Sequence, residues 1–215
     1  MKLEGLTFAF LGDSITEGVG TTAPEKRYFE LLKNRWGLKE VLGYGISGTR
    51  FARQRIPSDP PSFDRFFGSR VEEMAEADGV VVFGGTNDYG HGDAPIGSFD
   101  DRTPDTFYGA CHSLFSSLIA KYPGKPVVIM TPLHRIGEDT VKDNHGTATT
   151  LRTYVEIIRQ VAEYYSLPVC DLFRNSGLQP EVPAVLEGFV PDGLHPNDAG
   201  HEILADRLGF FLESL

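Results

Sequence analysis

The sequence has 215 residues, of which 40% are hydrophobic and 23% charged, a length and composition typical of one compact domain with a sizeable core. The formal net charge is −10 at pH 7, so repulsion from phosphate groups disfavours nucleic acid and anionic membranes as partners. No window is apolar over the length needed to cross a bilayer. The small number of cysteines and the lack of a recognisable export signal predict a cytoplasmic protein without disulfides.

Five short apolar runs alternate with longer amphipathic segments along the chain. This alternation predicts an α/β fold, with a five-stranded parallel sheet flanked by helices, in a single domain spanning residues 1–215. The predicted strands are 7–11, 40–42, 79–83, 126–131 and 167–171. The predicted helices are 28–35, 107–118, 151–165 and 203–212, the last following a start signal at Pro196-Asn197.

Glycine and small polar residues follow each of the first three predicted strands. The three segments are Gly12-Asp13-Ser14, 43–48 (GYGISG) and 84–88 (GGTND). Ligands collect at the carboxyl ends of parallel strands, so these segments are expected to converge on one site. Two long polar segments, 50–70 and 133–149, interrupt the alternation and are expected to be binding loops or covers of that site.

Ser14, Asp192 and His195 are the side-chain types of an acyl-transfer site. A serine hydroxyl is a weak nucleophile at neutral pH, so it needs a histidine to accept its proton and a carboxylate to orient that histidine. The negative charge that develops on the attacked carbonyl oxygen needs donors already in place. The backbone amides of Ser14 and Gly45 and the side-chain amide of Asn87 are predicted to supply them, and glycine at position 45 is expected to allow a close approach to substrate.

The four blocks GDS, GxSG, GGTND and DGLHPN resemble those of the SGNH hydrolases, also called the GDSL esterase/lipase family. They occur in the family's order between residues 12 and 197. The resemblance implies a flavodoxin-like three-layer α/β/α sandwich, with Ser14, Asp192 and His195 as the triad and Ser14, Gly45 and Asn87 as the oxyanion hole. Gly43 stands where the family usually has an asparagine that braces the second block. Oligomers are common in the family, which leaves self-association open.

The expected function is hydrolysis of short-chain acyl esters, acetyl foremost, on a small-molecule or oligosaccharide substrate, with no cofactor and no metal. Lysophospholipid or thioester hydrolysis remains open, because it uses the same machinery. A metal-dependent phosphoesterase is a weaker alternative, since the histidines show no metal-ligand spacing. A non-catalytic binding module is also weaker, because it would not explain an intact triad. Candidate substrate-binding residues at the sheet edge and in the polar loops are Asp13, Tyr89, His91, His134, Arg135 and Asn144.

Overall fold

The computed structural model describes residues 1–143 and 148–215 and contains a central sheet of five parallel strands. Its order is β2-β1-β3-β4-β7. The strands are β1 (Thr7–Gly12), β2 (Glu40–Gly45), β3 (Gly79–Phe83), β4 (Val127–Met130) and β7 (Val169–Cys170). All five lie where the sequence predicts strands, and the three-layer α/β/α architecture is confirmed.

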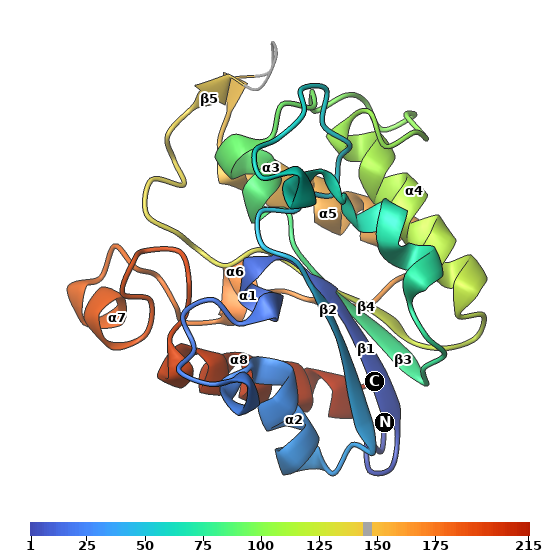
Figure 1. Cartoon of the computed structure of the whole chain (residues 1–215), viewed down its shortest axis with the longest axis vertical. Helices are drawn as coiled ribbons and strands as arrows, with labels where there is room; N and C mark the ends of the chain where they lie inside the picture. Colours follow the sequence, from blue (N-terminus) through green and yellow to red (C-terminus); the bar gives the residue numbers. More distant parts are fainter. Residues whose placement is uncertain (144–147) are drawn as a thin grey trace.

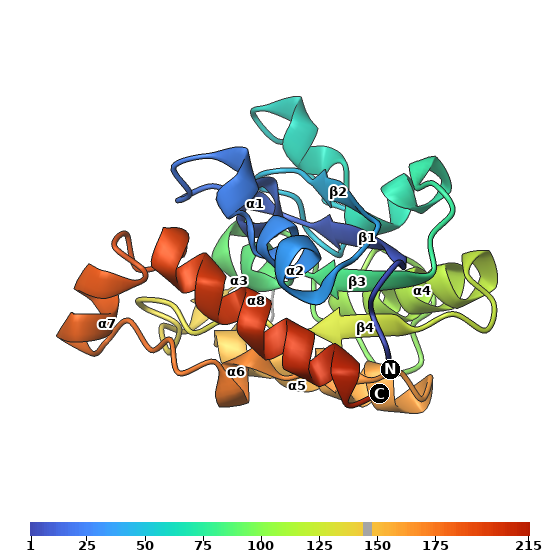
Figure 2. The ribbon, with the colours of Figure 1, turned by 90° about the horizontal axis from the view of Figure 1, so that it is seen from below.

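Four long helices cover the two faces of the sheet (Figures 1 and 2). Helices α2 (Tyr28–Trp36) and α8 (Asp198–Glu213) pack on one face, and α4 (Phe107–Lys121) and α5 (Leu151–Tyr164) on the other. Residues of β1 alternate between the two cores, with Phe8 and Phe10 facing α2 and α8 while Ala9 and Leu11 face α4 and α5. The Asn197 side chain caps α8 by accepting a hydrogen bond from Gly200 N at 3.0 Å.

Short elements occupy the connections between these layers. They are α1 (Ser14–Glu17), α3 (Thr86–His91), α6 (Leu172–Asn175), α7 (Pro183–Gly188), the 3-10 helices η1 (Pro24–Lys26), η2 (Pro61–Asp64) and η3 (Phe67–Glu73), and an antiparallel pair of two-residue strands, β5 (Lys142–Asp143) and β6 (Ala148–Thr149). Helix α1 begins directly after β1, and helix α3 begins close to the end of β3. Both helices therefore start at the carboxyl edge of the sheet, which is the edge where ligands bind in folds of this kind.

Strand β2 is longer than the sequence predicts and ends at Gly45 instead of residue 42. The extension pairs Gly43 with Phe10 and Gly45 with Gly12 of β1. Glycines are unfavourable in an isolated strand, but the neighbouring strand holds them in register here. The loop that follows β2 therefore begins three residues later than predicted.

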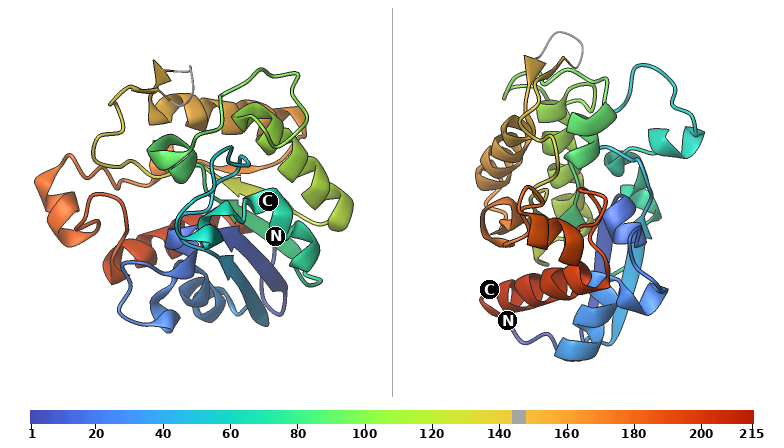
Figure 3. Two further views of the ribbon diagram at one scale, coloured as in Figure 1. Left: turned by 45° about the horizontal axis from the view of Figure 1, so that its top comes forward. Right: turned by 90° about the vertical axis from the view of Figure 1, so that its left-hand side faces the viewer.

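The two long polar segments have mixed roles. Residues 50–70 bury Phe51 and Phe67 in the core, while the part of this segment around η2 projects from the body of the molecule (Figure 3). Segment 133–149 carries β5 and β6, and Asn144 lies outside the described residues. Among the residues that the structure describes, no helix is both long and apolar enough to span a membrane.

His201 of α8 contacts Tyr28, the first residue of α2. Its side chain is fully buried, its Nδ1 accepts a hydrogen bond from Tyr28 N at 3.0 Å, and its ring stacks on that of Tyr28 with centroids 6.0 Å apart. Burial lowers the pKa of His201 to about 4, so the ring is neutral near pH 7. The histidine is therefore part of the packing between the two helices.

Candidate active site

Ser14 lies at the junction of β1 and α1. The Asp13 carboxylate caps α1 by accepting a hydrogen bond from Ile15 N at 3.0 Å, and Ser14 is the first residue of the helix. Its backbone amide is consequently one of the N–H groups that have no acceptor within the helix. A Cβ at Gly12 would lie 1.9 Å from Thr16 Oγ1, so only glycine permits this tight turn from strand to helix.

Ser14, His195 and Asp192 form a continuous chain of hydrogen bonds. Ser14 Oγ lies 3.0 Å from His195 Nε2, and His195 Nδ1 lies 2.7 Å from Asp192 Oδ2. Both distances are within the range of direct hydrogen bonds. The geometry is that required for a histidine to accept the serine proton while a carboxylate holds the opposite ring nitrogen.

Asp192 also organises the backbone of its own loop. Its Oδ1 accepts hydrogen bonds from Leu194 N at 2.9 Å and His195 N at 2.6 Å. Partial burial works against ionisation of this carboxyl, but the hydrogen bonds from the His195 backbone, the His195 ring and Leu194 outweigh it and lower the pKa of Asp192. The carboxylate is therefore ionised at neutral pH and able to stabilise a positively charged imidazole.

Gly45 does not face the site in the way the sequence predicts. An added Cβ would lie 2.2 Å from Glu17 N, so the missing side chain accommodates the backbone of α1 and not a substrate. The glycine of this segment that borders the Ser14 cleft is Gly48. Gly48 has a φ of +73° in a turn closed by the bond from Thr49 N to Ile46 O, a conformation that favours glycine.

Within the described residues, no hydrogen-bond acceptor is present for Gly48 N. The Gly48 amide is therefore available to a ligand in the cleft, beside Ser14. The sequence predicts Gly45 as the second oxyanion donor, but the lining of the cleft favours Gly48 for this role. A glycine that must adopt positive φ just after a strand is the sequence signal that identifies this position.

Two charged side chains brace the end of β2 and the loop that follows it. Gly43, at the position of the asparagine expected from the resemblance, lies within β2. Buried Arg70 donates hydrogen bonds to Gly12 O at 3.2 Å, Tyr44 O at 2.6 Å and Thr49 Oγ1 at 3.1 Å. On the other side, Glu17 of α1 accepts hydrogen bonds from the backbone and hydroxyl of Ser47. The ends of β1 and β2 and the turn at Gly48 are thus held together without the asparagine.

The Asn87 side chain is fixed at both ends of its amide. Its Nδ2 donates to Thr49 O at 3.0 Å, and its Oδ1 lies 3.2 Å from His91 Nε2. Nδ2 carries a second hydrogen, which remains available to the cleft. Partial burial, together with nearby Arg50 and Arg135, lowers the pKa of His91. A neutral His91 with hydrogen on Nε2 donates to Asn87 and keeps the Nδ2 end directed toward Thr49 and the cleft.

An open cleft of about 350 Å³ contains Ser14 and His195. Its other lining residues are Val19, Ser47, Gly48, Phe63, Asn87, Gly90, His91, Arg135 and Leu194. Of the predicted substrate-binding residues, His91 and Arg135 therefore border the cleft. The segments 50–70 and 133–149 contribute to it through Phe63 and Arg135.

Three predicted substrate contacts do not border this cleft. Tyr89 is buried, and its hydroxyl donates to Gly137 O at 2.6 Å and Thr140 O at 2.8 Å, so it holds segment 133–149 against α3. His134 stacks on Phe173 with centroids 4.0 Å apart and pairs with Glu138 at 2.7 Å, away from Ser14. Asp13 caps α1 from inside the protein.

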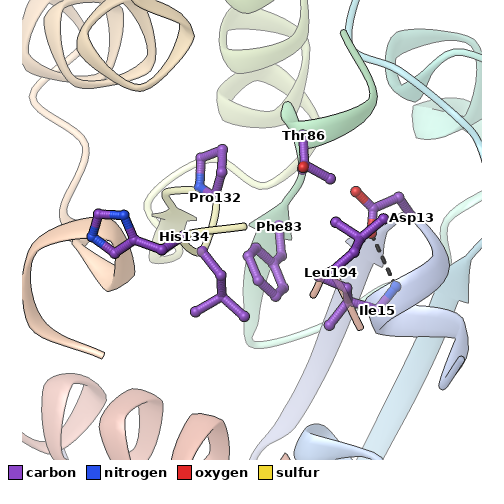
Figure 4. Close-up of a pocket in the computed structure, with 9 residues that line it drawn as sticks. Asp13, Ile15, Phe83, Thr86, Pro132, His134 and Leu194 are labelled. Atoms are coloured by element: carbon purple, nitrogen blue, oxygen red, sulfur yellow. Dashed lines mark hydrogen bonds between the residues drawn. The ribbon is translucent and has the colours of Figure 1, made fainter. Parts of the chain in front are cut away.

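A small closed cavity lies behind the site (Figure 4). Asp13 and Thr86 border it on one side and His134 on the other, with the His134 ring directed away. Its volume of about 10 Å³ leaves room for at most about one water molecule. Burial raises the pKa of Asp13 to about 6 in spite of the hydrogen bond from Ile15 N. This cavity is too small for an ester substrate, so the open cleft is the candidate binding site.

Comparison with known proteins assigns the family. The model of the GDSL-like Lipase/Acylhydrolase family matches residues 10–203, so the chain belongs to this family of ester hydrolases. No match was found among the curated proteins. Among the described residues, no group of three His, Cys, Asp or Glu side chains is arranged to hold a metal ion.

Solved structures share the fold over the whole chain. A protein from Lactobacillus plantarum is 30% identical, with a TM-score of 0.82 over 100% of this chain and 98% of that one. A lipase/acylhydrolase from Enterococcus faecalis is 20% identical, with a TM-score of 0.61 over 97% and 95% of the two chains. A two-domain esterase active on acetylated mannans is 22% identical, with a TM-score of 0.63 over 98% of this chain and 49% of that one.

Proposed function

We propose that the protein is a serine esterase that removes short acyl groups, acetyl foremost, from carbohydrate. The observation that carries the proposal is the hydrogen-bonded chain from Ser14 through His195 to Asp192 at the wall of an open cleft. The acetylated-mannan esterase that shares the fold supports the choice of acetyl esters on sugar. The modest size of the cleft is compatible with a small acyl group.

The proposed reaction gives each residue of the site a role that fits its position. His195 Nε2 accepts the Ser14 proton as Oγ attacks the ester carbonyl, and Asp192 stabilises the resulting imidazolium. The Ser14 and Gly48 amides and the Asn87 Nδ2 group donate hydrogen bonds to the oxyanion. The alcohol leaves with the proton from His195, and a water activated by the same histidine then releases the acyl group from Ser14.

A longer acyl chain is the second candidate substrate. Val19, Phe63 and Leu194 are apolar residues in the lining of the cleft, and an apolar lining suits the longer acyl chains of lysophospholipids or thioesters. The two candidates differ in the length of chain that the enzyme accepts. A graded series of substrates therefore separates them.

The proposal is tested with p-nitrophenyl esters from acetate to palmitate. We expect hydrolysis of the short esters by the wild type and none by Ser14→Ala, which removes the nucleophile and little buried volume. Circular dichroism and thermal melting of Ser14→Ala control for folding. Activity that survives in Ser14→Ala, or that is lost on chelation, would contradict a serine mechanism. A preference for palmitate would favour the lipid substrates.

A further inference from the structure

Arg135 presents a positive charge to the cleft that contains the nucleophile. Its side chain is half-buried and lines the same cavity as Ser14 and His195. Nη1 donates to Thr86 O at 3.3 Å and Thr86 Oγ1 at 3.2 Å. Thr86 directly precedes Asn87, so the guanidinium is anchored to the first turn of the helix that carries the predicted oxyanion donor.

No carboxylate lies within 4.0 Å of the Arg135 guanidinium in the described part of the chain. Its Nε is buried without a hydrogen-bond partner. Removing a charge from water without a counter-charge is unfavourable, and it lowers the pKa of Arg135 although Tyr89 and Asp192 act in the opposite direction. An arginine still remains charged at neutral pH, so the cleft contains a cation without a paired anion.

Two further cations approach the same wall. Lys142 Nζ donates to Gly90 O at 2.8 Å, and Arg50 Nη1 lies 3.5 Å from His91 O. Arg50 is partly neutralised by nearby Asp88 and Asp93 and by Asp64 at 4.0 Å. The ammonium of Lys142 lies over the Tyr89 ring at 4.8 Å. Among the described residues that line the cleft, Arg135 is the only lysine or arginine, in a protein whose formal net charge is −10.

We propose that the ester substrate carries an anionic group, a carboxylate or a phosphate, which binds Arg135 while the scissile carbonyl lies beside Ser14. The inference rests on the proposed esterase function and specifies its substrate class. A guanidinium recognises both anions through charge-assisted hydrogen bonds. Nη1 is already bound to Thr86 and Nε is buried, so Nη2 is the guanidinium nitrogen that is left to bind the anion.

Matched pairs of esters test the proposal. One pair places the charge on the acyl side, 4-nitrophenyl hydrogen succinate against its methyl ester. The other places it on the alcohol side, 3-acetoxybenzoate against methyl 3-acetoxybenzoate. Each pair is assayed with wild type, Arg135→Gln, Arg135→Lys and the control Arg53→Gln, which removes an exposed arginine paired with Asp105 outside the cleft.

We expect the wild type to prefer the anionic member of at least one pair. Arg135→Gln should reduce kcat/KM for that ester by about 10- to 100-fold, the effect of losing one charge-assisted hydrogen bond, while the neutral member changes less than about 3-fold. Arg135→Lys should retain part of the preference, and Arg53→Gln all of it. Equal losses on both members, or no preference in either pair, would overturn the proposal and leave Arg135 as a brace for Thr86.

Binding separates failure of this inference from failure of the esterase function. Calorimetric titration of Ser14→Ala with succinate and with inorganic phosphate measures anion binding without turnover. Binding that is lost in the double variant Ser14→Ala/Arg135→Gln supports the anionic site even if the wild type cleaves none of the esters. Binding that is unchanged by Arg135→Gln would count against the site whatever the activity.

Discussion

Asn87 illustrates how much of the proposed chemistry depends on the orientation of one side chain. Its amide is held between Thr49 O and the His91 ring, which leaves a single N–H of Nδ2 for the cleft. A donor fixed before the reaction stabilises developing charge without reorganisation. An amide that rotated freely would first have to be oriented, and would stabilise the developing charge less.

We predict that Asn87→Ala lowers kcat by about 10²- to 10³-fold, the usual effect of removing one oxyanion donor. KM should change little, because the bond strengthens in the transition state. Steady-state kinetics on a short-chain ester measures both parameters. Asn87→Asp, which keeps the size of the side chain but replaces the donor with an acceptor, should lose at least as much. A kcat within about five-fold of wild type in either variant would remove Asn87 from the oxyanion hole.

For single residues, the sequence predicts which side chains have suitable chemistry better than it predicts where those side chains point. Ser14, Asp192 and His195 are predicted together and the structure brings them together, because each follows a strand or turn that fixes its place. Tyr89 and His134 also follow strands, but neither side chain borders the cleft. The Tyr89 hydroxyl bonds to the backbone of segment 133–149, and the His134 ring stacks on Phe173. The direction of a loop side chain depends on contacts with distant segments, which periodicity does not encode. The bracing role of Arg70 has no local signal at all.

At the scale of elements, β2 and α1 pack backbone against backbone near the site. Gly45 ends β2 directly beside Glu17 N, and the register with β1 fixes this position. The strands could be predicted from their apolar runs, whereas the end of β2 could not, because its last residues are glycines that are held only by the neighbouring strand. The end of β2 also separates the two glycines: Gly45 is the last residue of the strand, whereas Gly48 lies in the turn that follows it.

We predict that Gly45→Ala destabilises the protein by about 1–3 kcal/mol, the usual cost of forcing an extra methyl group into a packed interior. The methyl group would meet backbone atoms, which cannot rotate away. Urea unfolding monitored by fluorescence measures the change. Gly188→Ala is the matched control, since no heavy atom lies within 4 Å of its added Cβ, and it should stay within about 0.5 kcal/mol of wild type. Equal stability of the two variants would refute the proposed packing.

At the scale of the whole molecule, buried titratable groups couple the fold to pH. The pKa of His201 is lowered from 6.5 to about 4 in the folded state. At this group the unfolded chain therefore binds more protons than the folded one between these values, so the contribution of His201 to stability falls as pH is lowered through this window. Above pH 6.5 the ring is neutral in both states and the penalty disappears.

We predict that His201→Asn reduces the loss of stability between pH 7 and pH 4.5. Asparagine retains an acceptor for Tyr28 N but does not titrate, so the wild type should lose up to about 3 kcal/mol more than the variant over this interval. Urea unfolding at both pH values gives the difference. Parallel losses in the two proteins would show that His201 is not the group responsible.

Ser14 and His195, the proposed nucleophile and base, are separated by 181 positions in the chain. During synthesis, the strand that carries Ser14 is made early and the loop that carries His195 late, so a growing polypeptide has a serine without a partner for most of its length. Ester hydrolysis should therefore appear only after the loop that carries His195 docks against the junction of β1 and α1. Release of a coloured product from an ester would then report the time at which folding is complete. Spectroscopic signals from individual helices do not report this step.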